Sequence, residues 1–81
     1  MRTFVKVPYE NGYYKFYLNH LLEEKKISKN HLCRETELDF KTIQRYCTGN
    51  LTRLDLSVLA RICDLLNCKI NEIVEYIPNQ K

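Results

Sequence analysis

The chain has 81 residues, of which 44% are hydrophobic and 28% charged, and its formal net charge is +3. This size allows one domain with a small core, and the composition is typical of a folded chain. No apolar run approaches the roughly 20 residues that cross a bilayer, and no hydrophobic signal sequence is visible. We therefore expect a cytoplasmic protein that does not enter the membrane.

The basic residues gather in the middle of the chain. Between Lys25 and Arg53 seven basic residues stand against three acidic ones, which gives this segment a net charge of +4. The residues before it are neutral overall, and those after it carry a net charge of −1. A basic segment of this kind favours a surface that binds a polyanion such as nucleic acid. On charge alone, an ordinary solvated surface is the alternative.

The cysteines and histidines do not form a recognisable metal or redox motif. They are Cys33, Cys47, Cys63, Cys68, His20 and His31. No two cysteines have the C-x-x-C spacing, and the histidines are not spaced as ligands on one helix. We expect reduced cysteines that pack as small apolar residues, with no metal and no cofactor. An enzyme is disfavoured because no nucleophile–base pair and no phosphate-binding loop is visible.

The beginning of the chain predicts a short strand followed by a helix. Thr3–Val7 is rich in β-branched and aromatic residues, which are typical of a strand. Asn11-Gly12 is a common hairpin turn, so Tyr13–Tyr17 is a candidate second strand. The apolar spacing in that segment continues to Leu21 at helical intervals, and this favours a first helix over residues 13–26.

Three further helices begin with one local pattern. An apolar residue precedes a side chain that can accept a backbone N–H bond, and another apolar residue follows four positions later. The pattern occurs at Ser28, Asp39 and Asp55. A last short helix is expected before Pro78. The helices predicted after the first one are Lys29–Glu35, Phe40–Thr48 (ended by Gly49), Leu56–Leu66 and Asn71–Tyr76.

These elements predict an all-α fold of five helices with a short N-terminal β-strand extension. Residues 1–12 would form the extension, residues 13–78 the helical domain and residues 79–81 a tail. The second and third helices are too short to be stable alone. Joined by the turn Thr36–Leu38, they would form a helix-turn-helix, with Cys33 facing Ile43 and Tyr46.

One face of the predicted third helix is left exposed and carries side chains suited to DNA. Arginine and lysine can donate to guanine, glutamine can bind adenine through two hydrogen bonds, and phenylalanine can contact a thymine methyl group. The residues on this face are Phe40, Lys41, Gln44 and Arg45. Residues placed to approach phosphates near the helix N-termini are Ser28, Lys29, Thr48, Asn50, Thr52 and Arg53. Taken singly, each of these polar residues is equally compatible with a solvated surface.

The segment from Leu18 to Pro78 carries a characteristic set of residues, namely Ile27-Ser28-Lys29, Leu32-Cys33, Leu38-Asp39, Thr42-Ile43, Tyr46, Gly49, Leu59, Ile62–Cys68 and Glu72–Pro78. In these residues it resembles the Cro/repressor-like (Xre-type) helix-turn-helix regulators, and within them a subgroup of compact bacterial members. The resemblance implies a five-helix domain that binds operator DNA, usually as a dimer. It also implies that Lys29 approaches bases together with the third helix, and that Ser28, Thr48 and Asn50 approach phosphates.

Two residues depart from the pattern of that family. Cys33 stands where the family usually has alanine, which is a mild change. Glu37 stands in the turn where the family usually has glycine or a similar residue. If this turn requires a positive φ, the glutamate side chain strains it.

We therefore predict a transcriptional regulator that reads a short palindromic operator in double-stranded DNA with its third helix. The alternative is a protein-interaction module such as an antitoxin, with Tyr9, Tyr13, Tyr14 and Tyr17 as a partner surface. Packing of the extension on the first helix is the simpler explanation of these tyrosines. We also expect a homodimer, because an unpaired strand at Thr3–Val7 would pair with its copy in a second chain.

Overall fold

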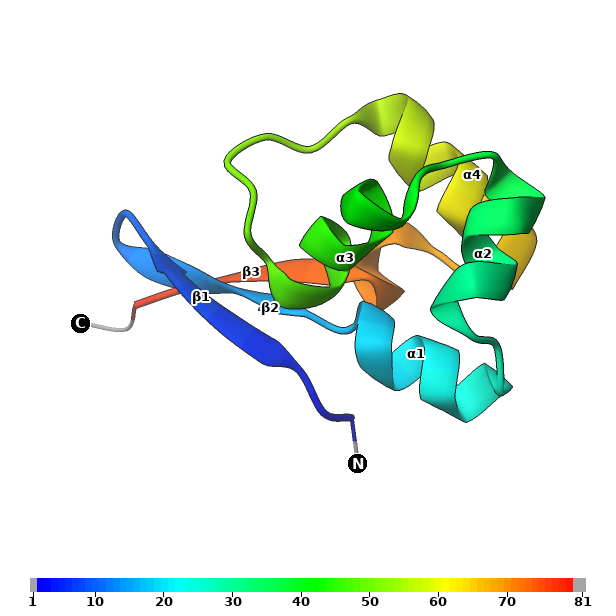
Figure 1. The fold of residues 1–81 in the computed structure, drawn as a ribbon. Helices are drawn as coiled ribbons and strands as arrows, with labels where there is room; N and C mark the ends of the chain where they lie inside the picture. Colours follow the sequence, from blue (N-terminus) through cyan, green and yellow to red (C-terminus); the bar gives the residue numbers. More distant parts are fainter. Residues whose placement is uncertain (1, 80–81) are drawn as a thin grey trace.

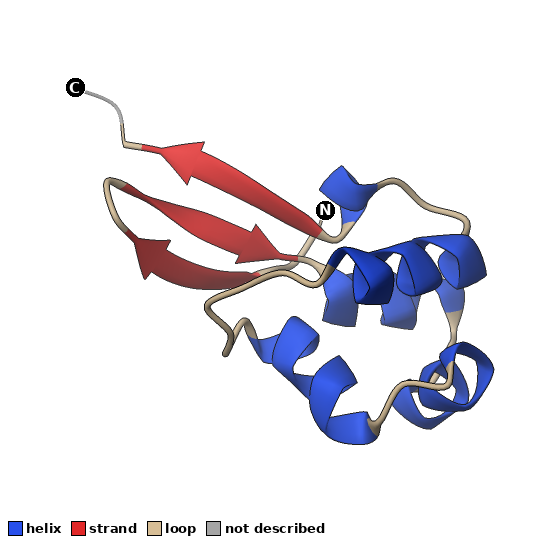
Figure 2. Cartoon of the chain, turned by 90° about the horizontal axis from the view of Figure 1, so that it is seen from above, coloured by secondary structure: helices blue, strands red, loops and turns tan. Residues whose placement is uncertain are grey.

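The computed structural model describes residues 2–79, which form four α-helices and a three-stranded antiparallel sheet (Figure 1). Seen from above, the sheet lies to one side of the helices (Figure 2). The elements in chain order are β1 (Val5–Tyr9), β2 (Gly12–Phe16), α1 (Leu18–Lys25), α2 (Lys29–Thr36), α3 (Phe40–Thr48), α4 (Leu56–Leu66), the short 3₁₀ helix η1 (Ile70–Glu72) and β3 (Val74–Pro78).

The all-α fold of five helices predicted from the sequence is wrong at both ends of the chain. The segment at residues 13–16 belongs to strand β2, so α1 begins only at Leu18. The fifth helix expected at Asn71–Tyr76 is replaced by η1 and strand β3. Strand β2 lies between β1 and β3, and Tyr14 is paired with Val7 on one side and Tyr76 on the other. Pairing on both edges outweighs the local helical spacing, because strand formation depends on neighbouring strands more than on local propensity.

The hairpin that joins β1 and β2 turns one residue earlier than its sequence suggests. Tyr9 is paired with Gly12, so the turn is Glu10-Asn11, and Glu10 has a φ of 55°. Gly12 itself lies in β2, where a Cβ atom would collide with the carbonyl oxygen of Ile77 in β3. The glycine therefore permits close approach of the third strand, in addition to marking the turn.

The N-terminal strand is present, but its partner lies in the same chain. It spans Val5–Tyr9 rather than Thr3–Val7, and all five of its residues are paired with β2. The strand therefore does not need a second copy to pair its backbone. An unpaired N-terminal strand is therefore no reason to expect a homodimer.

The core lies where the helices meet the sheet. Its most completely buried side chains come from α1, α2, α3, α4 and the segment after η1, and they are Leu18, Leu32, Ile43, Cys47, Ile62, Leu66 and Ile73. Phe16 of β2 and Val74 of β3 join the same core. Cys33 is half-buried against it. The helices and the sheet thus share one hydrophobic core, which holds the short helices in place.

Candidate nucleic-acid interface

Helices α2 and α3 form a helix-turn-helix around a left-handed residue. Glu37, which follows α2 directly, has a φ of 61° and a ψ of 30°. Just before it, the hydroxyl of the buried Thr36 donates to the carbonyl of Leu32 at 2.6 Å. Glu37 therefore occupies the conformation in which a side chain costs conformational energy, as its departure from the family pattern suggested.

The three helix starts predicted from the local pattern are confirmed by their caps. The hydroxyl of Ser28 accepts from the His31 N–H at 3.0 Å, and the carboxylate of Asp39 accepts from the Thr42 N–H at 2.9 Å. The carboxylate of Asp55 caps α4 in the same way. Each cap satisfies a backbone donor that the first helical turn leaves free.

The cap of α3 also carries a negative charge. The hydrogen bond from Thr42 lowers the pKa of Asp39 below its usual value, and the positive charges of Arg45 and Lys41 lower it further. The amide groups at the start of α3 are thus already facing a carboxylate. The start of α2, capped by the neutral hydroxyl of Ser28, has no such charge.

Six of the ten predicted contact residues line one shallow hollow on α3 and the residues after it. They are Phe40, Lys41, Gln44, Arg45, Thr48 and Asn50. Phe40 is 50% exposed although it is a large apolar side chain. The structure therefore brings the four predicted residues of the third helix together with two predicted phosphate contacts.

The end of α3 is held by side-chain and backbone hydrogen bonds. The hydroxyl of Thr48 donates to the carbonyl of Gln44 at 3.0 Å and accepts from the Asn50 N–H at 3.4 Å. The N–H of Gly49 donates to the carbonyl of Arg45 at 2.8 Å. Thr48 thus positions the chain that carries Asn50, and much of its own hydrogen-bonding capacity is used for this.

A hydrogen bond between the two helices joins Lys29 to Gln44. The Lys29 Nζ, at the first position of α2, donates to the Gln44 Oε1, in the middle of α3, at 2.7 Å. Both side chains are half-buried. Lys29 and Ser28 line a separate shallow hollow where α1 meets α2. The sequence indicated both residues but not the contact between Lys29 and Gln44, which depends on the packing of two helices.

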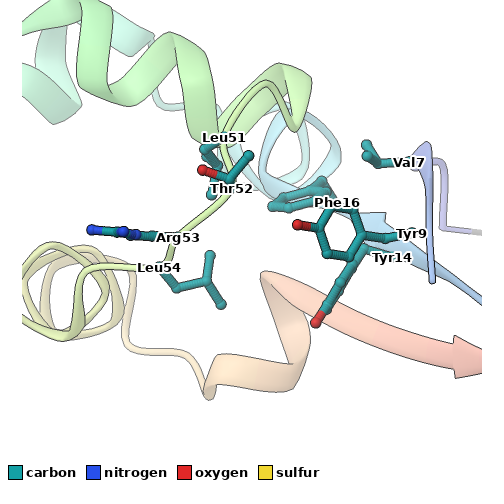
Figure 3. Close-up of a pocket in the computed structure, with 8 residues that line it drawn as sticks. All are labelled: Val7, Tyr9, Tyr14, Phe16, Leu51, Thr52, Arg53 and Leu54. Carbon is teal, nitrogen blue, oxygen red and sulfur yellow. The ribbon is translucent and has the colours of Figure 1, made fainter.

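Thr52 and Arg53 lie outside the hollow on α3. They are part of the loop between α3 and α4, and they line a small cavity with aromatic side chains of the sheet, among them Tyr14 and Phe16 (Figure 3). The Arg53 side chain extends away from these rings. The sheet residues of this cavity were not predicted from the sequence, because the segment of β2 was expected to be helical. The Asn11-Gly12 signal could have found it.

Residues 17–79 match the sequence profile of the Cro/C1-type helix-turn-helix DNA-binding domain. The chain belongs to this family. The resemblance to Xre-type regulators, stated from the residues of the helix-turn-helix, is thereby confirmed. A comparison with curated proteins gave no match.

A solved structure shares the fold of this Cro/C1-type domain. The crystal structure of the transcriptional regulator VanUg, form II, superposes with a TM-score of 0.66 and 24% sequence identity. The similarity covers 90% of this chain and 96% of that chain. It therefore extends over nearly the whole of both chains and is not confined to a short motif.

The thiols of the Cro/C1-type domain are placed for packing. Burial raises the pKa of Cys47 to about 11, and burial also raises the pKa of Cys33. Thiols of this kind react slowly at neutral pH because the thiolate is the reactive form. Within residues 2–79, no three potential metal-ligating side chains gather. None of the helices in the same range is long and apolar enough to cross a membrane.

Proposed function

We propose that this Cro/C1-type DNA-binding domain is a transcriptional regulator that inserts α3 into the major groove of a short palindromic operator. The observation that carries the proposal is the hollow on α3, in which Phe40, Lys41, Gln44 and Arg45 share one accessible face. Arginine and lysine match the acceptors of guanine, and a phenylalanine ring matches a thymine methyl group. The fold shared with a transcriptional regulator supports the same proposal.

Phosphate groups would hold the domain around this reading face. The proposed contacts are Ser28, Thr48, Asn50, Thr52 and Arg53. Of the two helix N-termini, that of α2 suits a phosphate better, because the Asp39 carboxylate already faces the amides of α3. The side chain of Arg53 extends away from the aromatic rings of the sheet, and we propose that its guanidinium group contacts a phosphate.

A palindromic operator would be bound by two copies of the domain. The two halves of such a site are related by a two-fold axis, which a symmetric protein dimer reproduces. The proposed dimer is not tied to the N-terminal strand, because β1 already has a partner strand, β2, in its own chain.

The alternative role as a protein-interaction module is less well supported by the tyrosines. Tyr17 is 4% exposed and its hydroxyl donates to Glu75 at 2.8 Å. The ring of Tyr14 packs against that of Tyr76, with 4.9 Å between ring centroids. These two side chains are used within the fold, and Tyr9 is the exposed member of the group.

The proposal is tested in two steps. Bound sites are first selected from a random duplex pool, and two variants are then titrated with the selected duplex and with a scrambled duplex. We expect Arg45→Ala to cost about 1–3 kcal/mol on the selected site and little on scrambled DNA, because it removes a base contact. We expect Arg53→Ala to weaken both duplexes alike and to reduce the salt slope by about one. A pool with no enriched sequence would favour the interaction module instead.

A further inference from the structure

We propose that Lys29 determines which base Gln44 reads, by turning Gln44 into a hydrogen-bond donor that prefers guanine over adenine. This inference rests on the proposed function, in which α3 reads base edges. It concerns the specificity of that same surface and identifies a positioning role for a residue on α2.

The chemistry of the pair determines the orientation of the glutamine amide. A lysine ammonium group has three donors and no acceptor, so the atom of Gln44 that it contacts must be the carbonyl oxygen. The 2.7 Å distance between Lys29 Nζ and Gln44 Oε1 is that of a charge-assisted hydrogen bond. The amide NH₂ group of Gln44 is consequently the end left for another partner.

The residue that carries this NH₂ group belongs to the reading surface. Gln44 lines the hollow on α3 together with Lys41 and Arg45, and Lys29 contacts Gln44 from the start of α2. Lys29 is half-buried, and its charge lies near enough to the buried Cys47 to lower the pKa of that thiol, against the larger effect of burial. The ammonium group is therefore held between the helices and forms the pair without DNA.

The two purines differ in what they offer to such a pair. Adenine presents an acceptor at N7 and a donor at N6, and a glutamine binds both when its carbonyl oxygen is available. Guanine presents acceptors at N7 and O6. Beside Lys29, the carbonyl oxygen of Gln44 is engaged and a positive charge lies next to it. That charge repels the N6 donor of adenine and attracts the O6 acceptor of guanine.

Site selection from a random duplex pool with five proteins tests this assignment. Gln44→Ala identifies the base pair whose preference depends on Gln44. At that pair the wild-type domain is expected to select guanine over adenine by about tenfold. Lys29→Met removes the ammonium group and keeps an unbranched side chain, so its preference is expected to shift toward adenine. Lys29→Arg retains a cationic donor and is expected to retain guanine.

The control for lost charge is Lys25→Met, because Lys25 lies at the end of α1, where its charge acts on Cys68, and it is not part of the Lys29–Gln44 pair. Lys25→Met should leave the preference unchanged at the base pair that the Gln44→Ala variant identifies. Circular dichroism checks that all variants are folded. Three results would overturn the inference: selection of adenine by the wild type, an unchanged preference in Lys29→Met, or the absence of any base pair whose preference depends on Gln44. If the pool still contains an enriched operator, these results leave the proposed function standing. A pool without any enriched site would overturn both.

Discussion

The left-handed residue in the turn between α2 and α3 allows a direct test of backbone strain. Glu37 is exposed and has a φ of 61°. A non-glycine residue in this conformation costs about 1–2 kcal/mol, which glycine avoids. Glycine also increases the entropy of the unfolded chain, which costs about 0.4–1 kcal/mol. We expect Glu37→Gly to raise the free energy of unfolding by roughly 0.5–1 kcal/mol, the difference between these two effects.

Thermal unfolding followed by circular dichroism measures this gain. For a domain of this size the expected rise in Tm is about 2–8 °C, since 1 kcal/mol corresponds to roughly 4–8 °C. Glu35→Gly is the matched control, because it removes the same charge two positions earlier, within α2. There glycine should lower stability by up to about 1 kcal/mol. A lower Tm for Glu37→Gly than for the wild type would show that the glutamate side chain contributes more than its backbone strain costs.

Two further predictions concern the ends of α3. We expect Gly49→Ala to lower the free energy of unfolding by at least about 2 kcal/mol, because φ is 77° there and the new Cβ would lie 2.5 Å from a methyl carbon of Val7. Urea titration measures this loss, and an unchanged unfolding midpoint would contradict the expected crowding. The pKa of Asp39 is lowered in the folded state from its usual 3.8, so its stabilising effect is present above that value and is lost as the pH falls through the folded value. The wild type should therefore lose more stability than Asp39→Asn as the pH falls below about 4. If the free energy of unfolding of the two proteins fell by the same amount over this pH range, the prediction would be wrong.

The helices of the binding motif could be predicted because their signals are local. A cap such as Ser28 or Asp39 is recognised by the residue before it and the residue four positions after it, and the structure shows both caps in place. Helical spacing likewise predicted that Lys41, Gln44 and Arg45 share a face. The path of the loop that carries Arg53 could not be predicted from such local signals, because the loop lies against the sheet.

The sheet could not be predicted with the same success because its decisive contacts join distant parts of the chain. Val74–Pro78 has no regular alternation of apolar and polar residues that would indicate a strand, and it forms one by pairing with β2. The resemblance to five-helix relatives favoured a helix in that segment, and the helical spacing after Tyr13 favoured another. The turn signal at Asn11-Gly12 was the one short-range indication of β2, and it was outweighed by the longer apolar pattern.

The central position of β2 has a consequence for the order in which the domain is made. Its first neighbour, β1, precedes it directly, but its second neighbour, β3, lies near the other end of the sequence, where Val74 pairs with Phe16. During synthesis the hairpin can form from local contacts as it leaves the ribosome, whereas the short helices depend on the core that they share with the sheet. The backbone groups on one edge of β2 and the core side chains of this strand stay exposed to solvent until residues 74–78 have left the ribosome. Helices α2 and α3 are therefore translated well before the strand that completes the sheet with which they share a core.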